Sequence, residues 1–110
     1  MIYEMRRYEC LPGKLASLNS LMENLAIPIM KKHGMTLVGA WTPLVGDVEA
    51  TLIYILAFET MDEWKTKWAS FYADQEWKEK RAEIARKEGG PMVARISNVF
   101  IAPTSYSPLQ

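Results

Sequence analysis

The sequence is poor in the residues that mark several classes of protein. Among 110 residues it has one cysteine, Cys10, and one histidine, His33. An internal disulfide and a zinc site of cysteine and histidine ligands are therefore both excluded. A single cysteine suits the reducing cytoplasm. No apolar run approaches the ~20 residues that a membrane-spanning helix needs, and the N-terminus shows no cleavable signal pattern. We expect a cytoplasmic protein without metal or organic cofactor.

The sequence also lacks net charge, because 13 basic and 13 acidic side chains cancel. A neutral chain offers no electrostatic attraction for nucleic acid or for an anionic membrane. The apolar segment 51–59 also lacks the basic, glycine and aromatic pattern with which some sheets stack RNA bases. We therefore expect neither nucleic acid nor membrane as a partner. The length predicts one domain, residues 1–110.

The first third of the sequence predicts a strand followed by a helix. Residues 2–10 are rich in strand-forming side chains, and Pro12 and Gly13 end that strand. Pro28 is expected to kink the helix or restart its last turn. Gly34 is expected to end it. The helix is indicated by apolar side chains three and four positions apart: Leu15, Leu18, Met22, Leu25 and Ile29.

The rest of the sequence predicts two strands, a helical segment and a last strand. Residues 35–42 read as a strand with Gly39 at a bulge or a close approach, followed by a turn at Gly46–Asp47. Residues 51–59 form an apolar run that favours a central strand. Thr60 begins a capping box, and Asp74 is expected to cap a further helical turn before the strand at 92–102. The expected order is βαββαβ.

That order is typical of a ferredoxin-like α+β fold. In this topology the antiparallel sheet has the order 4-1-3-2 and both helices lie on one face. The apolar segment 51–59 would then leave a large patch on the uncovered face. We therefore expect a homodimer, in which a second copy buries that patch.

Several short motifs resemble the NIPSNAP family. Residues 4–8 (EMRRY) look like the opening of that family, and residues 11–15 (LPGKL) look like its following turn. Residues 28–41, which include His33, Gly34, Gly39 and Trp41, are similar to its helix-to-strand passage. Residues 74–77 (DQEW) and 103–109 (PTSYSPL) resemble its later motifs. The third strand departs from the family, which often has His and Trp there, two residues apart; this sequence has Tyr54 and Leu56.

The resemblance implies a dimeric α+β barrel, in which two sheets enclose a central space. The same superfamily contains small monooxygenases, haem-degrading enzymes and isomerases. Single-domain relatives generally lack an assigned activity. The resemblance therefore implies the fold and leaves the function open.

The candidate site follows from alternation along the first strand. Glu4, Arg6 and Tyr8 share one face, which we assign to the barrel interior because Met5 suits the helix side better. Tyr54 on the third strand is expected to lie across from them, with Arg6 paired to Glu4. A structural ion pair and a core aromatic are the alternatives.

Two further residues complete the candidate site. Leu37, Gly39 and Trp41 share a face of the second strand, where Trp41 would wall a pocket or lie in an interface. His33 ends a helix, where a surface histidine interacting with the helix dipole is the alternative to a ligand-binding role.

Three functions remain open. The leading one is a homo-oligomeric barrel with a small-molecule pocket in its interior. The second is a cofactor-independent enzyme, like a monooxygenase or an isomerase, acting on a small aromatic or polyketide-like substrate through proton transfer. The third is a structural or protein-interaction module whose interior is filled by its own side chains.

Overall fold

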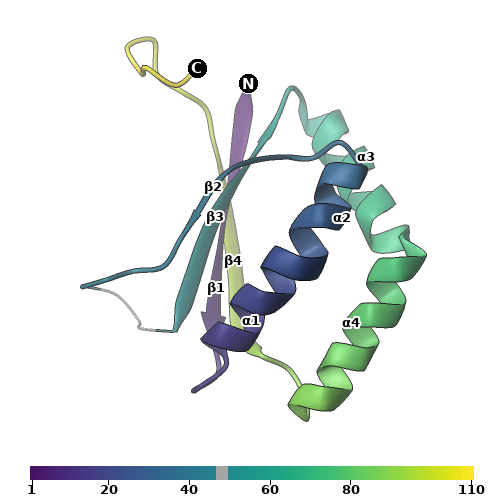
Figure 1. Cartoon of the computed structure of the whole chain (residues 1–110). Helices are drawn as coiled ribbons and strands as arrows, with labels where there is room; N and C mark the ends of the chain where they lie inside the picture. The colour runs from purple at the N-terminus through teal and green to yellow at the C-terminus, as the bar shows by residue number, and fades with distance from the viewer. Residues whose placement is uncertain (47–49) are drawn as a thin grey trace.

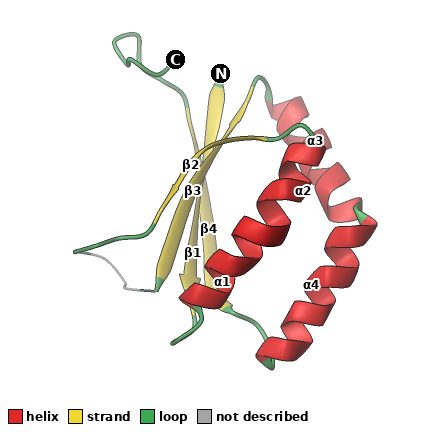
Figure 2. Cartoon of the chain, viewed as in Figure 1, coloured by secondary structure: helices red, strands yellow, loops and turns green. Residues whose placement is uncertain are grey.

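The chain forms one antiparallel sheet with helices packed on one of its faces (Figures 1 and 2). The computed structural model describes residues 1–46 and 50–110. The predicted turn at Gly46–Asp47 lies partly outside the described residues. The elements are β1 (Ile2–Cys10), α1 (Leu15–Leu21), η1 (Met22–Ala26), α2 (Ile27–Lys32), β2 (Thr36–Trp41), β3 (Thr51–Phe58), α3 (Met61–Ala73), α4 (Gln75–Glu88) and β4 (Val93–Ile101).

The sheet has the order β2-β3-β1-β4, and every neighbouring pair is antiparallel. From the other edge this is the predicted order 4-1-3-2, so the ferredoxin-like prediction is confirmed. The central pair is in register from Ile2 opposite Phe58 to Glu9 opposite Thr51. Among the described residues, no helix is long and apolar enough to cross a membrane.

The first helical segment runs through α1, η1 and α2 without a break. Its middle section, η1, is a π-helix, in which the Ile27 N–H bonds to the Met22 carbonyl five residues earlier. Normal α geometry begins again at Ile27, and Pro28 lies at the start of α2. Proline is tolerated in a first helical turn because it has no N–H to donate. The predicted restart near Pro28 is confirmed in the sense that α geometry resumes there after a π-helical section.

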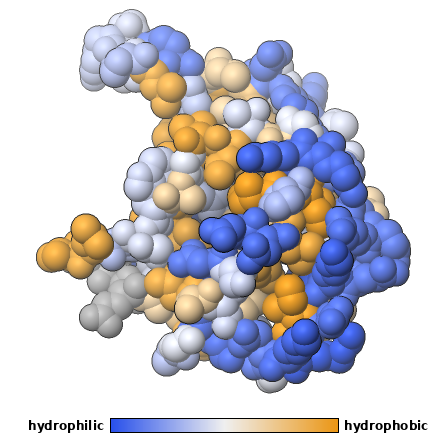
Figure 3. Space-filling model, in the orientation of Figure 1, coloured by the Kyte–Doolittle hydropathy of each residue, from blue (hydrophilic) through white to orange (hydrophobic). Residues whose placement is uncertain are grey.

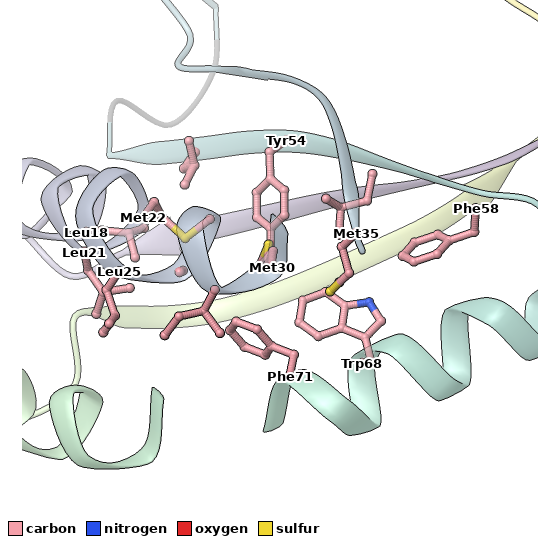
Figure 4. Packing of buried hydrophobic residues seen from close by; sticks show 14 of the residues in the cluster. Leu18, Leu21, Met22, Leu25, Met30, Met35, Tyr54, Phe58, Trp68 and Phe71 are labelled. Carbon is pink, nitrogen blue, oxygen red and sulfur yellow. The ribbon is translucent and has the colours of Figure 1, made fainter. Parts of the chain in front are cut away.

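The core lies between the sheet and the helices (Figure 4). From β3, Tyr54, Leu56 and Phe58 reach it and are almost completely buried. Figure 4 shows the Tyr54 ring pointing from the sheet toward the helix layer, near Met30. This face of β3 is therefore the one that the helices cover.

A bulge in β2 changes which residues share a face. Leu37 pairs with Leu56, but the register shifts before Gly39, which pairs with Ile55. Gly39 and Trp41 therefore lie on the opposite face from Leu37, and the prediction that all three share a face is wrong. The Trp41 ring lies over Gly39, where an added Cβ would come within 2.6 Å of it. The predicted close approach at Gly39 is thus correct.

In the described part of the chain, no helix covers the other face of the sheet (Figures 1 and 2). Cross-strand pairing places apolar side chains from all four strands on it, and Trp41 there is 52% exposed. We call this the open face, and its apolar residues include Met5, Trp41, Ile53, Ile55, Val99 and Ile101.

Side-chain caps define the two C-terminal helices. The Thr60 hydroxyl accepts the Glu63 N–H at 3.1 Å, and Glu63 accepts the Glu59 N–H at 2.8 Å. Asp74 caps α4 by accepting the Trp77 N–H at 3.0 Å. Both predicted caps are confirmed.

Asp74 also holds the end of the first helical segment. Its Oδ2 lies 2.8 Å from His33 Nε2 and 2.6 Å from Lys32 Nζ. The bonds from Lys32, His33 and the Trp77 N–H keep the pKa of Asp74 well below its usual range. His33 therefore joins two helices in this structure.

Asp74→Asn should destabilise the protein at neutral pH, because asparagine keeps the cap but loses the charge. A carboxyl whose pKa is lowered by folding contributes stability above its ordinary pKa of about 3.9, and that contribution disappears as the pH falls further. The difference in unfolding free energy between wild type and variant should therefore shrink below about pH 4. Urea unfolding at a series of pH values measures it.

The control is Asp62→Asn, which neutralises an exposed acid in the first turn of α3. It should change the unfolding free energy little at any pH. A wild-type advantage over Asp74→Asn that persists undiminished into acid would contradict the assignment.

Candidate functional site

The buried carboxylate of Glu4 lies at the centre of the candidate site. Its side chain is 0% exposed, and four donors satisfy its two oxygens. Trp64 and Trp68 of α3 donate their indole N–H groups to Oε1 at 3.0 and 2.9 Å. Asn98 of β4 donates to Oε2 at 2.8 Å, as does Arg6 Nη1 at 2.9 Å. A charge survives such burial only when it is fully paired.

Arg6 is the next residue on the same face, and its side chain is 11% exposed. Its guanidinium carbon lies 4.6 Å from the centre of the Trp68 ring, which is a cation–π contact. Its Nε and Nη2 donate to the Tyr8 hydroxyl at 3.3 and 3.2 Å. Burial alone lowers the pKa of Arg6, but Tyr54, Tyr8 and Glu4 raise it on balance. The guanidinium therefore remains charged.

Tyr8 and Tyr54 form a pair of phenols beside this arginine. Their hydroxyl oxygens are 2.8 Å apart, and their rings meet edge to face. Burial raises the pKa of Tyr54 well above its usual value of 10, so this phenol stays neutral. The pair contains two hydroxyl hydrogens but shares only one hydrogen bond.

The direction of that bond follows from burial. Tyr54 is 0% exposed, and in the described part of the chain its hydroxyl has no acceptor besides Tyr8. If Tyr8 donated, the Tyr54 hydrogen would be buried without a partner, at a cost of about 1–3 kcal/mol. We therefore assign Tyr54 as the donor. The Tyr8 oxygen then accepts from Tyr54 and Arg6, and its own hydrogen is left to point away from both.

A cavity of about 630 Å³ has Tyr8 among its lining residues, so we expect this hydrogen to face it. Arg6 and Tyr8 line it, as do residues of the first helical segment, α3, α4 and the start of β4. Most of its wall is apolar, and Figure 3 shows hydrophobic atoms in the gap between the first helical segment and α4. The volume lies within the ~300–1,000 Å³ of ordinary ligand pockets. The polar cluster therefore forms one end of a largely apolar cavity.

The structure brings together four of the six predicted site residues: Glu4, Arg6, Tyr8 and Tyr54. Their predicted pairing is correct, but their predicted face is wrong. They lie under the helices, while Met5 lies on the open face opposite Ile55 and Val99. The helix side accepts these charges because the indole N–H groups of α3 and the Asn98 amide satisfy Glu4.

The other two predicted residues lie elsewhere. Trp41 is on the open face, which is the barrel-interior side predicted for it, and His33 is bound to Asp74. Neither lines the cavity.

Sequence reasoning missed three donors and one charge. Trp64 and Trp68 are two indoles four residues apart on one helix, and they present two N–H groups to one site. Asn98 could have been found from its place opposite Arg6 in the antiparallel pairing. Arg81 lines the cavity from α4, and no local pattern in the sequence singles it out.

Comparison with protein families gives one match. The NIPSNAP profile covers residues 3–108. No curated protein matches the chain.

Several solved structures share the fold. A NIPSNAP family protein of unknown function from Agrobacterium tumefaciens is 26% identical, with a TM-score of 0.83 over 100% of this chain and 94% of that one. A second A. tumefaciens NIPSNAP protein is 21% identical, with a TM-score of 0.86 over 99% and 98%. A Streptomyces coelicolor monooxygenase in complex with nanaomycin D is 13% identical, with a TM-score of 0.61 over 96% and 89%.

Arg6→Ala should lower the unfolding free energy by roughly 3–5 kcal/mol, because it leaves the buried Glu4 carboxylate without its cation. The double variant Glu4→Gln with Arg6→Met should recover much of this loss, since no unpaired charge then remains. Chemical denaturation of the three proteins measures the difference.

The matched control is Arg95→Ala. Arg95 lies on β4 with its side chain 75% exposed, 3.6 Å from Glu9. An exposed pair of this kind contributes about 0–1 kcal/mol. If Arg6→Ala costs no more than Arg95→Ala, the buried pair does not stabilise the fold as described.

Proposed function

We propose a function for this chain on the premise that it belongs to the NIPSNAP family. It is a cytoplasmic homodimer, and each subunit binds a small molecule between the sheet and the helices. The observation that carries the proposal is the cavity of about 630 Å³ that ends at Arg6 and Tyr8. An interaction module would fill this space with its own side chains. In the proposed dimer, the two open faces would pack against each other and fill the barrel interior. The proposed pocket is therefore the cavity between the sheet and the helices of each subunit.

The dimer is supported by the apolar open face. A soluble monomer rarely exposes an apolar patch larger than a few hundred Å². A two-fold partner would present the same face, so each copy would bury the patch of the other. Cytoplasmic placement rests on Cys10, which is buried and unpaired in the described part of the chain.

A proton-transfer enzyme is the second candidate, favoured by the Tyr8 hydroxyl. Its oxygen accepts hydrogen bonds from a charged guanidinium, which makes its own hydrogen a better donor. Such a donor at one end of an apolar cavity suits a substrate oxygen that gains negative charge during reaction. An isomerase-like or monooxygenase-like reaction on an aromatic compound fits this arrangement, and the fold is shared with the S. coelicolor monooxygenase.

Sedimentation equilibrium at micromolar concentration should give the mass of a dimer. Ile55→Glu places a charge in the middle of the open face and should shift the protein toward monomer. Lys80→Glu, on the exposed side of α4, is the control and should leave the mass unchanged. A well-folded wild-type monomer at this concentration would rule out the dimer.

Native mass spectrometry of the purified protein should detect a bound small molecule. Ala26→Trp introduces a large side chain at the cavity wall and should abolish the adduct. Its far-ultraviolet circular dichroism and thermal unfolding check that it still folds. If wild-type protein carries no adduct and indole added at millimolar concentration produces no shifts in its NMR spectrum, the pocket does not bind flat aromatic ligands.

A further inference from the structure

We propose that the cavity selects a flat aromatic compound with two separate oxygen groups. The Tyr8 hydroxyl binds a neutral carbonyl oxygen at the inner end, and Arg81 binds a carboxylate, or a similar anion, at the mouth. This inference rests on the proposed binding function and specifies the class of ligand.

The walls of the cavity favour a flat apolar body. Trp68, Phe71, Tyr72 and Trp77 line one side in a run of contacting rings, with centroids 4.6–5.4 Å apart. Met22 and Met30 are among the residues that line the cavity from the first helical segment. Aromatic rings and thioethers stack on or surround flat aromatic ligands.

The inner end favours a neutral acceptor. The Arg6 charge is already balanced by Glu4, 2.9 Å away, so an anion at this end would lack a free cation. The Tyr8 hydrogen is the donor left over once the Tyr54–Tyr8 and Arg6–Tyr8 bonds are formed. The Tyr8 hydroxyl is a neutral donor, and the charge of the neighbouring Arg6 is already balanced. This end of the cavity therefore suits a neutral acceptor such as a carbonyl oxygen.

The mouth favours an anion. Arg81 is exposed and lines the cavity, and no aspartate or glutamate is among the described lining residues. On α4, Glu76 lies 2.9 Å from Lys80 and Glu83 lies 3.7 Å from Lys87, so each of these acids is next to a lysine. Arg81 is absent from the ion pairs of the described residues and is available for a ligand. Its planar guanidinium matches a carboxylate through two parallel hydrogen bonds.

Three matched probes separate the two contacts. 9-Fluorenone-2-carboxylate has both groups, fluorene-2-carboxylate lacks the carbonyl, and 9-fluorenone-2-carboxamide lacks the charge. Binding to the wild-type protein is monitored through NMR shifts of the Trp68 and Trp77 indole N–H signals. We expect the first probe to bind roughly 5- to 10-fold more tightly than either of the others, as the loss of one hydrogen bond or ion pair predicts.

Two variants assign each preference to its residue. Tyr8→Phe should abolish the preference for the carbonyl and keep the preference for the carboxylate. Arg81→Gln should do the reverse, and since Arg81 is exposed this variant should fold normally. Arg86→Gln, on the same helix but not among the lining residues, is the control and should change neither preference.

Equal affinity of the wild-type protein for all three probes would overturn the inference while leaving a general apolar pocket intact. Both preferences surviving in Tyr8→Phe and Arg81→Gln would also overturn it, because other groups would then make the contacts. If no probe shifts the indole signals, the inference is wrong, and the native mass spectrometry decides the broader proposal separately.

Discussion

The burial of one carboxylate, that of Glu4, constrains the whole arrangement of the site. An ionised side chain without access to water requires several donors, and here they come from three elements. Trp64 and Trp68 fix α3 over the sheet, Asn98 fixes β4 beside β1, and Arg6 supplies the opposite charge. The same network therefore holds helix, edge strand and central strand in one relative position.

The function that we propose depends on the hydroxyl of Tyr8, which lies at the end of this hydrogen-bond network. Glu4 has all its donors, and Arg6 is held by Glu4, by the Trp68 ring and by Tyr8. Arg6 contacts the Tyr8–Tyr54 pair, in which we assign the Tyr8 hydroxyl hydrogen as the one without a partner. Tyr8 also lines the cavity. A site held this rigidly can place a single donor accurately against a ligand, because its neighbours leave the tyrosine little freedom.

Much of the fold was predictable because its signals are local. Turn residues, the helical spacing of apolar side chains and two capping residues gave the order of elements, and that order with the apolar third strand gave the sheet order. The pairing of Arg6 with Glu4 also followed from alternation along one strand. The alternation did not show which face of β1 the helices cover. A glutamate can lie on the helix side only where donors such as Trp64 and Trp68 come from a distant part of the sequence.

The sequence by itself determined the βαββαβ order, the caps at Thr60 and Asp74 and the apolar character of β3. Only the tertiary structure decided which candidate residues meet. The β2 bulge moved Trp41 to the open face, since one extra residue reverses the side on which all later side chains point. Asp74 drew His33 into a helix junction, and helix packing placed the cavity beneath the helices. These outcomes depend on contacts between residues far apart in the chain, which no local pattern records.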